Sequence, residues 1–104
     1  MKILALVSLK KGIPMEQVRP ELQAELQGSW RLYLSGVLRE AYLTETATAV
    51  VFVLEAADQG SAAVQLQKLP LVAKGLFDLQ LHELRPFANW AMLPMAPGPA
   101  GASR

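Results

Sequence analysis

Residues 76–84 read L-F-D-L-Q-L-H-E-L, and this alternation of apolar and polar side chains predicts a β-strand with two unlike faces. Side chains alternate between the two faces of a strand. One face carries three apolar residues, Phe77, Leu79 and Leu81. The other carries an acid, an amide and the only histidine, Asp78, Gln80 and His82. We expect the apolar face to pack on helices, and the polar face to meet either open water or a polar cavity closed by a second sheet.

The first third of the chain predicts a strand followed by a helix. Residues 3–9 are almost continuously apolar, which is typical of a central strand. Either Pro14 or Pro20 can open the helix, because a proline in the first turn loses no required hydrogen bond. The apolar stripe of this helix steps by four, four and three residues, and we expect it to face the core: Leu22, Leu26, Trp30 and Tyr33. Gly36 fits the left-handed position that ends a helix.

The middle of the chain predicts a hairpin and a second helix. Residues 37–44 and 47–55 have the composition of strands, and the short link between them indicates a hairpin. Asp58 is a suitable N-cap for a helix that the approach to Pro70 ends. The resulting order is strand–helix–strand–strand–helix–strand. It predicts an α+β, ferredoxin-like βαββαβ fold, with a four-stranded antiparallel sheet and two helices on one face.

Length and composition indicate one domain that buries surface against another subunit. At 104 residues, the chain can form a single modest core. We predict that residues 1–93 form this domain and that the Pro, Gly and Ala-rich tail 94–104 is disordered. Hydrophobic residues make up 52% of the chain and charged residues 18%, which favours apolar contacts between subunits. The N-terminal apolar run breaks at Lys10 without a small-residue cleavage site, so we interpret it as a strand and not a signal peptide.

The net charge and the cysteine content exclude several classes of partner and cofactor. The net charge is +1 and no run of basic residues occurs, so neither nucleic acid nor a membrane is an expected partner. The absence of cysteine excludes disulfides, a thiol nucleophile and a thiolate metal site. One histidine argues against a metal site within a subunit, and the scattered glycines form no phosphate-binding loop. We expect a cytoplasmic protein.

The predicted sheet leaves one face uncovered by helices. That face includes the polar row of strand 76–84 and one of two sets from strand 37–44, either Leu38, Glu40 and Tyr42 or Val37, Arg39 and Ala41. Much of it is apolar, and its burial contributes about 25 cal/mol per Å². We therefore predict that two copies pair these faces as a homodimer or higher homo-oligomer. The paired sheets form a dimeric α+β barrel around a small-molecule pocket.

Three stretches of the chain carry a resemblance to a known family: L-Y-L-S-G-V-L-R-E at 32–40, L-P-L-V-A-K-G-L at 69–76 and L-R-P-F at 84–87. They resemble the muconolactone isomerase-like family of bacterial proteins, over about residues 1–90. The resemblance implies a dimeric α+β barrel, which some members assemble into larger rings. It also implies isomerisation of a small unsaturated lactone by proton transfer, without a metal or organic cofactor. The matching motifs are structural and assign no catalytic residue, so only local chemistry indicates the candidate site.

Three residues form the predicted catalytic set. His82 is the candidate general acid or base, because imidazole titrates near neutral pH. Asp78 lies four residues away on the same face, with Gln80 between them, and both can address one ligand. The phenol of Tyr42 can orient a ligand hydroxyl or carbonyl. The alternative is structural: His82 and Asp78 are solvated polar residues on an edge strand, and Tyr42 packs its ring and satisfies its hydroxyl.

The predicted substrate-binding residues are Arg39, Glu40 and Gln80. Arg39 can grip a carboxylate of a ligand with two hydrogen bonds, or it can form a surface or intersubunit ion pair. Arg39 and Glu40 are adjacent on a strand and lie on opposite faces, so only one of them can enter the pocket. Trp30 and Tyr33 are assigned to the core, not to ligand binding.

Several functions fit these residues. The first is cofactor-independent acid–base isomerisation of a small lactone or ring compound. A second enzyme class is a cofactor-independent monooxygenase acting on polyketide-like aromatic compounds. The third is a non-catalytic module for ligand binding or oligomeric assembly, which the apolar composition favours. Residues 85–93 are also apolar, and we expect them to form an arm over their own subunit or over a partner.

Overall fold

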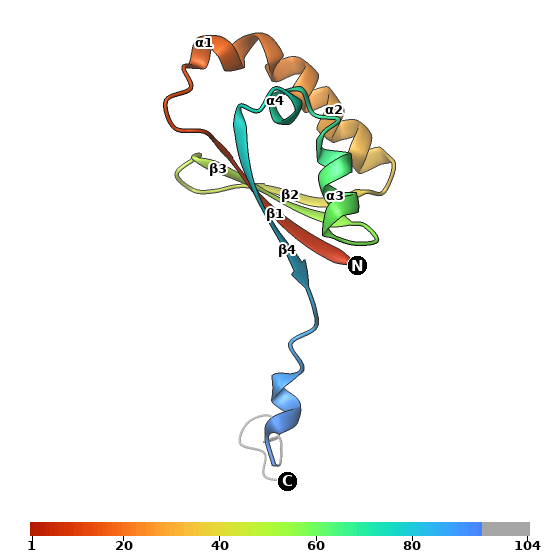
Figure 1. Cartoon of the computed structure of the whole chain (residues 1–104). Coiled ribbons are helices and arrows are strands. Elements are labelled where there is room, and N and C mark those ends of the chain that lie inside the picture. Colours follow the sequence, from red (N-terminus) through yellow and green to blue (C-terminus); the bar gives the residue numbers. More distant parts are fainter. Residues whose placement is uncertain (95–104) are drawn as a thin grey trace.

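A computed structural model gives the arrangement of residues 1–94, and most of the predicted tail 94–104 lies outside the described residues. Four antiparallel strands form one sheet in the order β2-β3-β1-β4 (Figure 1). Their bounds are β1 Lys2–Leu9, β2 Leu38–Leu43, β3 Ala49–Glu55 and β4 Phe77–Leu84. The position of β4 at the edge follows the prediction.

All the helices between the strands cover one face of this sheet (Figure 1). They are α1 Met15–Val18, the 3₁₀ turn η1 Arg19–Glu21, α2 Leu22–Leu34, α3 Gln59–Leu66 and α4 Pro70–Ala73. The predicted ferredoxin-like α+β fold is therefore confirmed. Within residues 1–94, none of the helices has the length and apolar character needed to span a membrane.

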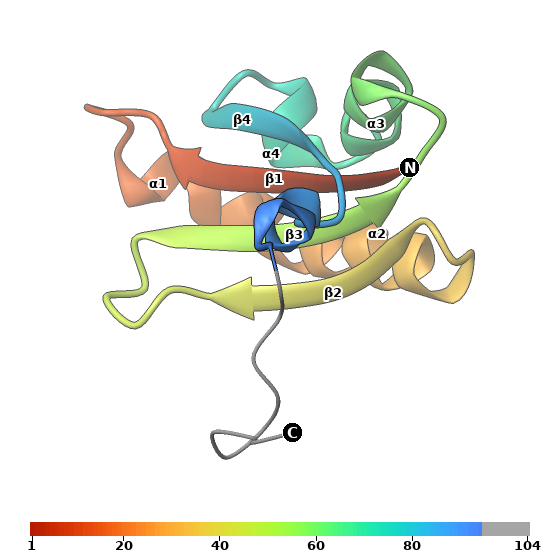
Figure 2. The same cartoon turned by 90° about the horizontal axis from the view of Figure 1, so that it is seen from below.

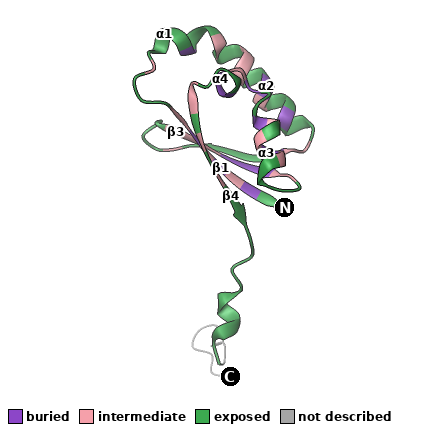
Figure 3. Cartoon of the chain, viewed as in Figure 1, coloured by how far each residue is buried: buried purple, intermediate pink, exposed green. Residues whose placement is uncertain are grey.

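The core lies between the sheet and these helices. Alternate residues of the central strands point into it and are buried, Ile3, Ala5 and Val7 from β1 and Phe52 and Leu54 from β3. The apolar row of β4 packs against this core, as its alternation predicts: Phe77, Leu79 and Leu81. The buried segments in Figure 3 accordingly gather where helices and sheet meet. Within residues 1–94, none of the α-helices lies on the opposite sheet face, and Figure 2 views the molecule from that side.

Helix α2 presents a different side to the core from the one that its spacing predicts. Trp30 is 59% exposed and Tyr33 is 50% exposed, so their assignment to the core is wrong. The buried residues of this helix are Gly28 and Leu32. The reason is close packing: a Cβ on Gly28 would lie 3.0 Å from Cδ2 of Leu69, a contact that only glycine fits without adjustment. The aromatic side chains of α2 therefore face outward, while Leu32 points into the core.

The turns differ from the prediction in detail. The hairpin link is longer than two residues, because β3 starts at Ala49 and the Thr44 N–H donates to the Ala49 carbonyl across the turn. Ala47 takes a positive φ of 58° in this turn. Asp58 caps α3 as predicted, with its carboxylate accepting the Ser61 N–H. Pro70 does more than end a helix, since it occupies the first turn of α4.

The segment after β4 stands away from the rest of the molecule. It leaves on the side of the sheet opposite the helices and ends in the 3₁₀ turn η2, Ala88–Met92 (Figures 1 and 2). We call residues 85–93 the arm. All of its residues are exposed, so the expectation that it covers its own subunit is wrong. Contact with a partner stays a prediction.

Candidate functional site

The uncovered sheet face carries most of the predicted site residues. Strand pairing places Glu40 beside Val53, Val53 beside Leu4, and Leu4 beside His82. This is one cross-strand row. A second row runs in the same order through Tyr42, Val51, Leu6 and Gln80. The face therefore has an apolar centre on β1 and β3, flanked by polar side chains on both edge strands.

The β4 edge of this face carries the polar row found in the sequence. Asp78, Gln80 and His82 alternate with the core residues and pair with Ser8, Leu6 and Leu4 of β1. All three side chains are exposed in the single chain. Within residues 1–94 they make no side-chain hydrogen bond, so they are available to a ligand or to a second sheet.

Neither of the two sets predicted for β2 shares one face as a whole, because Leu38 lies on the other side of the strand from Glu40 and Tyr42. Glu40 and Tyr42 point to the uncovered face, and Leu38 is buried on the helix side. A break in the β2–β3 register between Leu38 and Glu40 puts Arg39 at a bulge. The Arg39 Nε donates to the Gly36 carbonyl at 2.5 Å, so the bulge and this bond set the direction of the guanidinium.

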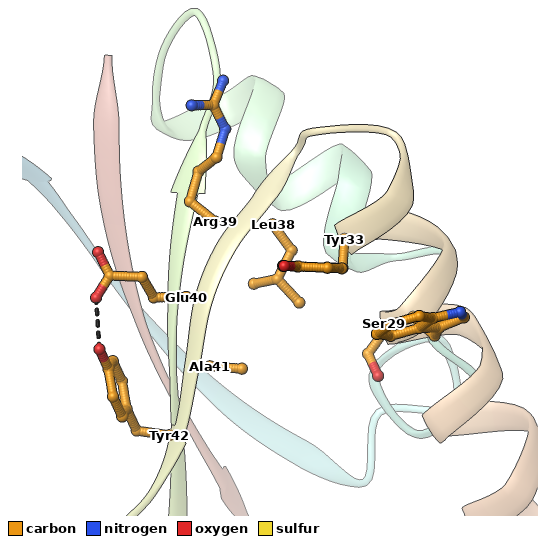
Figure 4. Close-up of a pocket in the computed structure, with 8 residues that line it drawn as sticks. Ser29, Tyr33, Leu38, Arg39, Glu40, Ala41 and Tyr42 are labelled. Carbon is orange, nitrogen blue, oxygen red and sulfur yellow. Dashed lines mark hydrogen bonds between the residues drawn. The ribbon is translucent and has the colours of Figure 1, made fainter.

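The side chains of Glu40 and Tyr42 form a hydrogen-bonded pair. The phenol hydroxyl of Tyr42 donates to Oε1 of Glu40 at 2.6 Å (Figure 4). This bond, and then the negative charge of Glu40, raise the pKa of Tyr42 above its ordinary value of 10.0. The phenol is the hydrogen-bond donor of the pair and the carboxylate is the acceptor.

The two polar edges do not meet within one chain. Three strand spacings of about 4.8 Å separate Glu40 from His82, which gives a backbone distance of about 14 Å. The structure thus brings Asp78, Gln80 and His82 together at one edge and Glu40 and Tyr42 at the other. A small ligand reaches both groups only if a second surface closes over the face.

A cleft that the sequence did not predict lies between α2 and β2. This α2–β2 cleft has a volume of about 430 Å³ and is lined by Ser29, Trp30, Tyr33, Leu38, Arg39, Glu40, Ala41 and Tyr42. Figure 4 shows Leu38, Ala41 and Tyr33 directed into the space between helix and strand, with Glu40 and Tyr42 on the other side of β2. The interior is therefore apolar and aromatic. One sequence signal could have indicated this cleft. Gly28 and Leu32 are four residues apart and mark the side of α2 that faces the core, which leaves Trp30 and Tyr33 outside the core.

The fold and its uncovered face define a ferredoxin-like α+β protein with an unpaired sheet surface. No protein-family model matches the chain. No curated protein matches it either.

Among solved structures, the chain is similar to 5-chloro-2-hydroxyhydroquinone dehydrochlorinase (TftG) from Burkholderia phenoliruptrix, in a complex with 2,5-dihydroxybenzoquinone. The TM-score is 0.65 at 19% sequence identity, and the match covers 82% of this chain and 94% of that chain. At this identity the likeness shows the fold. The resemblance to muconolactone isomerases stays a prediction.

Proposed function

We propose that this protein is a cofactor-independent enzyme that moves a proton within a small ring compound, in a pocket between the uncovered sheet faces of two copies. The observation that carries the proposal is the pair of cross-strand rows, which place an apolar floor between two polar edges. An apolar cavity with a few convergent polar groups is the usual composition of a small-molecule site.

A two-fold axis parallel to the strands brings the two edges together. Such an axis lays β4 of one copy over β2 of the other and keeps each cross-strand row at the same level. His82 then faces Glu40 of the second copy, and Gln80 faces its Tyr42. Packed sheets lie about 10 Å apart, a gap that a planar ring and the flanking side chains can fill. Each dimer contains two such sites.

The proposed chemistry is a proton shift between two atoms of one substrate. A base, His82 or Glu40 of the second copy, removes a proton from a carbon next to a carbonyl, and the electron pair moves into the conjugated system. The same proton, or one from solvent, then returns at the far end of that system. The substrate formula is unchanged and the base is regenerated, so the step balances without a redox partner.

The other edge residues bind and polarise the substrate in this scheme. Tyr42 turns its one O–H from Glu40, its acceptor in the single chain, to the carbonyl or enolate oxygen of the substrate, which leaves the Glu40 carboxylate free to accept a proton. Gln80 and Asp78 orient ring hydroxyls, and Arg39 at the rim of β2 attracts an anionic group. The lactone implied by the family resemblance fits this description. A hydroxylated quinone, such as the compound named with the structural neighbour, fits it equally well.

Solvent deuterium exchange tests the proposal, because it detects proton transfer whatever the product is. The protein is incubated in D₂O with a panel of muconolactones and hydroxylated quinones, and deuterium uptake at carbon is followed by NMR. We expect uptake into at least one compound, falling at least about 100-fold in H82A, as general acid–base contributions predict. Glu16→Gln, exposed in α1 on the helix side of the sheet, is the control. Equal rates in H82A and wild type contradict the proposal.

Subunit mixing tests whether the site is shared between copies. The inactive chains H82A and E40Q are co-expressed, so that mixed dimers form. One site of a mixed dimer then combines the intact His82 of one chain with the intact Glu40 of the other, and activity returns to about half per dimer on the two-fold scheme. No recovery in mixed dimers contradicts a shared site.

One observation favours a second candidate function, that of an assembly module. Large apolar side chains lie exposed on α2, β2 and the arm: Leu26, Trp30, Leu34, Leu43, Trp90 and Met92. Exposed patches of this kind mark interfaces. An oligomer that takes up no deuterium from any compound in the panel, with His82 replaceable at no cost, favours this candidate.

A further inference from the structure

We propose that the arm of one copy docks into the α2–β2 cleft of a second copy and thereby stabilises the dimer. The inference rests on the proposed pairing of sheet faces, and its test separates the two. The occupant is thus residues 85–93 of an identical chain. Three observations carry this assignment: the composition of the arm, the character of the cleft and the direction in which the arm leaves the sheet.

The arm has the composition of a covered segment but is exposed along its whole length in the single chain. Trp90 is 71% exposed, and Phe87 and Met92 are exposed as well. The rings of Phe87 and Trp90 meet edge to face with centroids 5.1 Å apart, so the arm presents one aromatic unit. Residues 86–94 include no charged side chain, so burying this part of the arm leaves no charge without a partner.

The α2–β2 cleft offers a matching surface. Trp30 and Tyr33 stack with ring centroids 5.2 Å apart along one wall, and Ala41 leaves space along the other. Its volume of about 430 Å³ is on the scale of pockets that bind a few large side chains or a small ligand. Among the lining residues drawn in Figure 4, no acid or base points into the space between helix and strand, which favours an apolar occupant over a substrate.

The path of the arm fits the second copy. The arm leaves β4 at Leu84 and passes the uncovered face on the side away from the helices (Figures 1 and 2). Leu84 pairs with Lys2, and Lys2 pairs with Glu55. The neighbouring Leu54 pairs with Leu38, so β4 ends at the same end of the sheet at which β2 begins. With a two-fold axis parallel to the strands, β2 of the second copy lies over β4. Because β2 is an edge strand, the arm can pass around it and reach the cleft on the helix side of the second copy.

Engineered cysteines test the docking, because the chain has no cysteine of its own. One tagged chain carries Asn89→Cys in the arm, and a differently tagged chain carries Ser29→Cys in the cleft. The two are co-expressed and oxidised, and the products are separated on a denaturing gel. We expect a mixed disulfide between the two tags as the main product. Val64→Cys, exposed on α3, replaces Ser29→Cys in the control and should give little mixed product.

A fluorescence measurement checks the result without a cross-link. The chain has two tryptophans, so Trp30→Phe leaves Trp90 as the only indole emitter. We expect emission at short wavelength in the dimer and a shift to longer wavelength on dissociation. A Trp90 that emits as a fully solvated indole in the dimer overturns the proposal.

Each outcome of the cross-linking decides something definite. A dimer without the 89–29 disulfide overturns arm docking and leaves the pairing of the sheet faces untouched. A single chain that carries both Asn89→Cys and Ser29→Cys provides a further check: if it forms the disulfide within itself as a monomer, the arm covers its own cleft and the proposal is overturned. A chain that stays monomeric overturns both the docking of the arm and the shared active site.

Discussion

Tyr42 and Glu40 are two exposed residues of β2 whose side chains form a hydrogen bond, with the phenol as donor and the carboxylate as acceptor. They lie two residues apart on one strand face, and the hydrogen bond between them is 2.6 Å long. The bond favours the protonated phenol and leaves the second carboxylate oxygen free. In the proposed closed pocket the pair faces the edge of a second sheet, and the phenol can donate to a substrate carbonyl once its O–H turns away from Glu40.

The raised pKa of Tyr42 gives a direct prediction. Tyr33→Phe leaves Tyr42 as the only tyrosine, so its ionisation can be followed by absorbance. We expect the phenol to titrate above 10.0, and Glu40→Gln to bring the pKa down toward that value because the carboxylate charge is removed. Identical titrations with and without Glu40→Gln contradict the pair.

Glu25 is a second residue whose charge state matters, here for stability. Its Oε1 accepts the Leu71 N–H at 2.8 Å, which ties α2 to the first turn of α4. Burial raises the pKa of this half-buried carboxyl above 4.5, and the backbone bond opposes the rise. The folded chain thus binds the proton more tightly than the unfolded chain. The stability contributed by the protonated group is complete below pH 4.5 and is lost as the pH rises through the folded pKa.

Two substitutions separate the charge of Glu25 from its hydrogen bond. Glu25→Gln keeps an acceptor for Leu71 without the charge, so we expect it to match or exceed the wild type at pH 7 and to lose that advantage near pH 4. Glu25→Ala leaves the amide unpaired and should lower the free energy of unfolding by about 1–3 kcal/mol. Urea unfolding at both pH values measures these differences. A wild type that gains on Glu25→Gln as the pH rises contradicts the pKa direction.

At the scale of the element, α2 is the part of the fold that its sequence predicts least well. The helix has apolar residues on two sides, and the choice between them depends on what it packs against. Gly28 decides the choice, because it lets the helix approach Leu69 more closely than any side chain allows. The aromatic side is left facing outward, where it lines the α2–β2 cleft.

A matched pair of glycine substitutions tests this packing. Gly28→Ala places a methyl group 3.0 Å from Leu69, so overpacking should lower the free energy of unfolding by about 1–3 kcal/mol. Gly60→Ala in α3 meets Asp58 at an ordinary 3.6 Å and should raise it by up to about 1 kcal/mol. Thermal unfolding of both variants provides the comparison. A Gly28→Ala chain as stable as Gly60→Ala would show that α2 packs less closely.

Strands and helices differ in how much of them the sequence predicts, for a physical reason. Period-two alternation in β4 leaves one apolar face and one polar face, so the core side is unambiguous and Asp78, Gln80 and His82 fall together as expected. The bulge at Arg39 is different. It depends on the register against β3, which no local pattern contains, and so do the cross-strand row from Glu40 to His82 and the existence of the α2–β2 cleft.

At the scale of the whole molecule, one sheet face and one arm lie uncovered, and a second copy covers both in the proposed arrangement. Leu4 and Leu6 occupy the centre of the face, where a two-fold axis along the strands sets them against Val53 and Val51 of the other copy. The helix-side core does not include these two side chains. Substitutions there can therefore affect pairing while the fold is kept.

Leu6→Lys tests the role of the face in assembly. A buried ammonium without a partner costs several kcal/mol, so we expect the dimer dissociation constant to rise by at least about 100-fold. Circular dichroism should stay that of the folded chain. Val64→Lys adds the same charge at an exposed apolar position on α3 and should leave the dimer intact. A Leu6→Lys chain that dimerises as well as Val64→Lys would place the interface elsewhere.

Sedimentation equilibrium of the unmodified protein at micromolar concentration tests the central claim most directly. Two sheet faces that bury their apolar rows against each other predict a mass of at least twice the 11.3 kDa chain. A stable mass of a single 11.3 kDa chain under these conditions would leave the His82 row in open water and contradict the account.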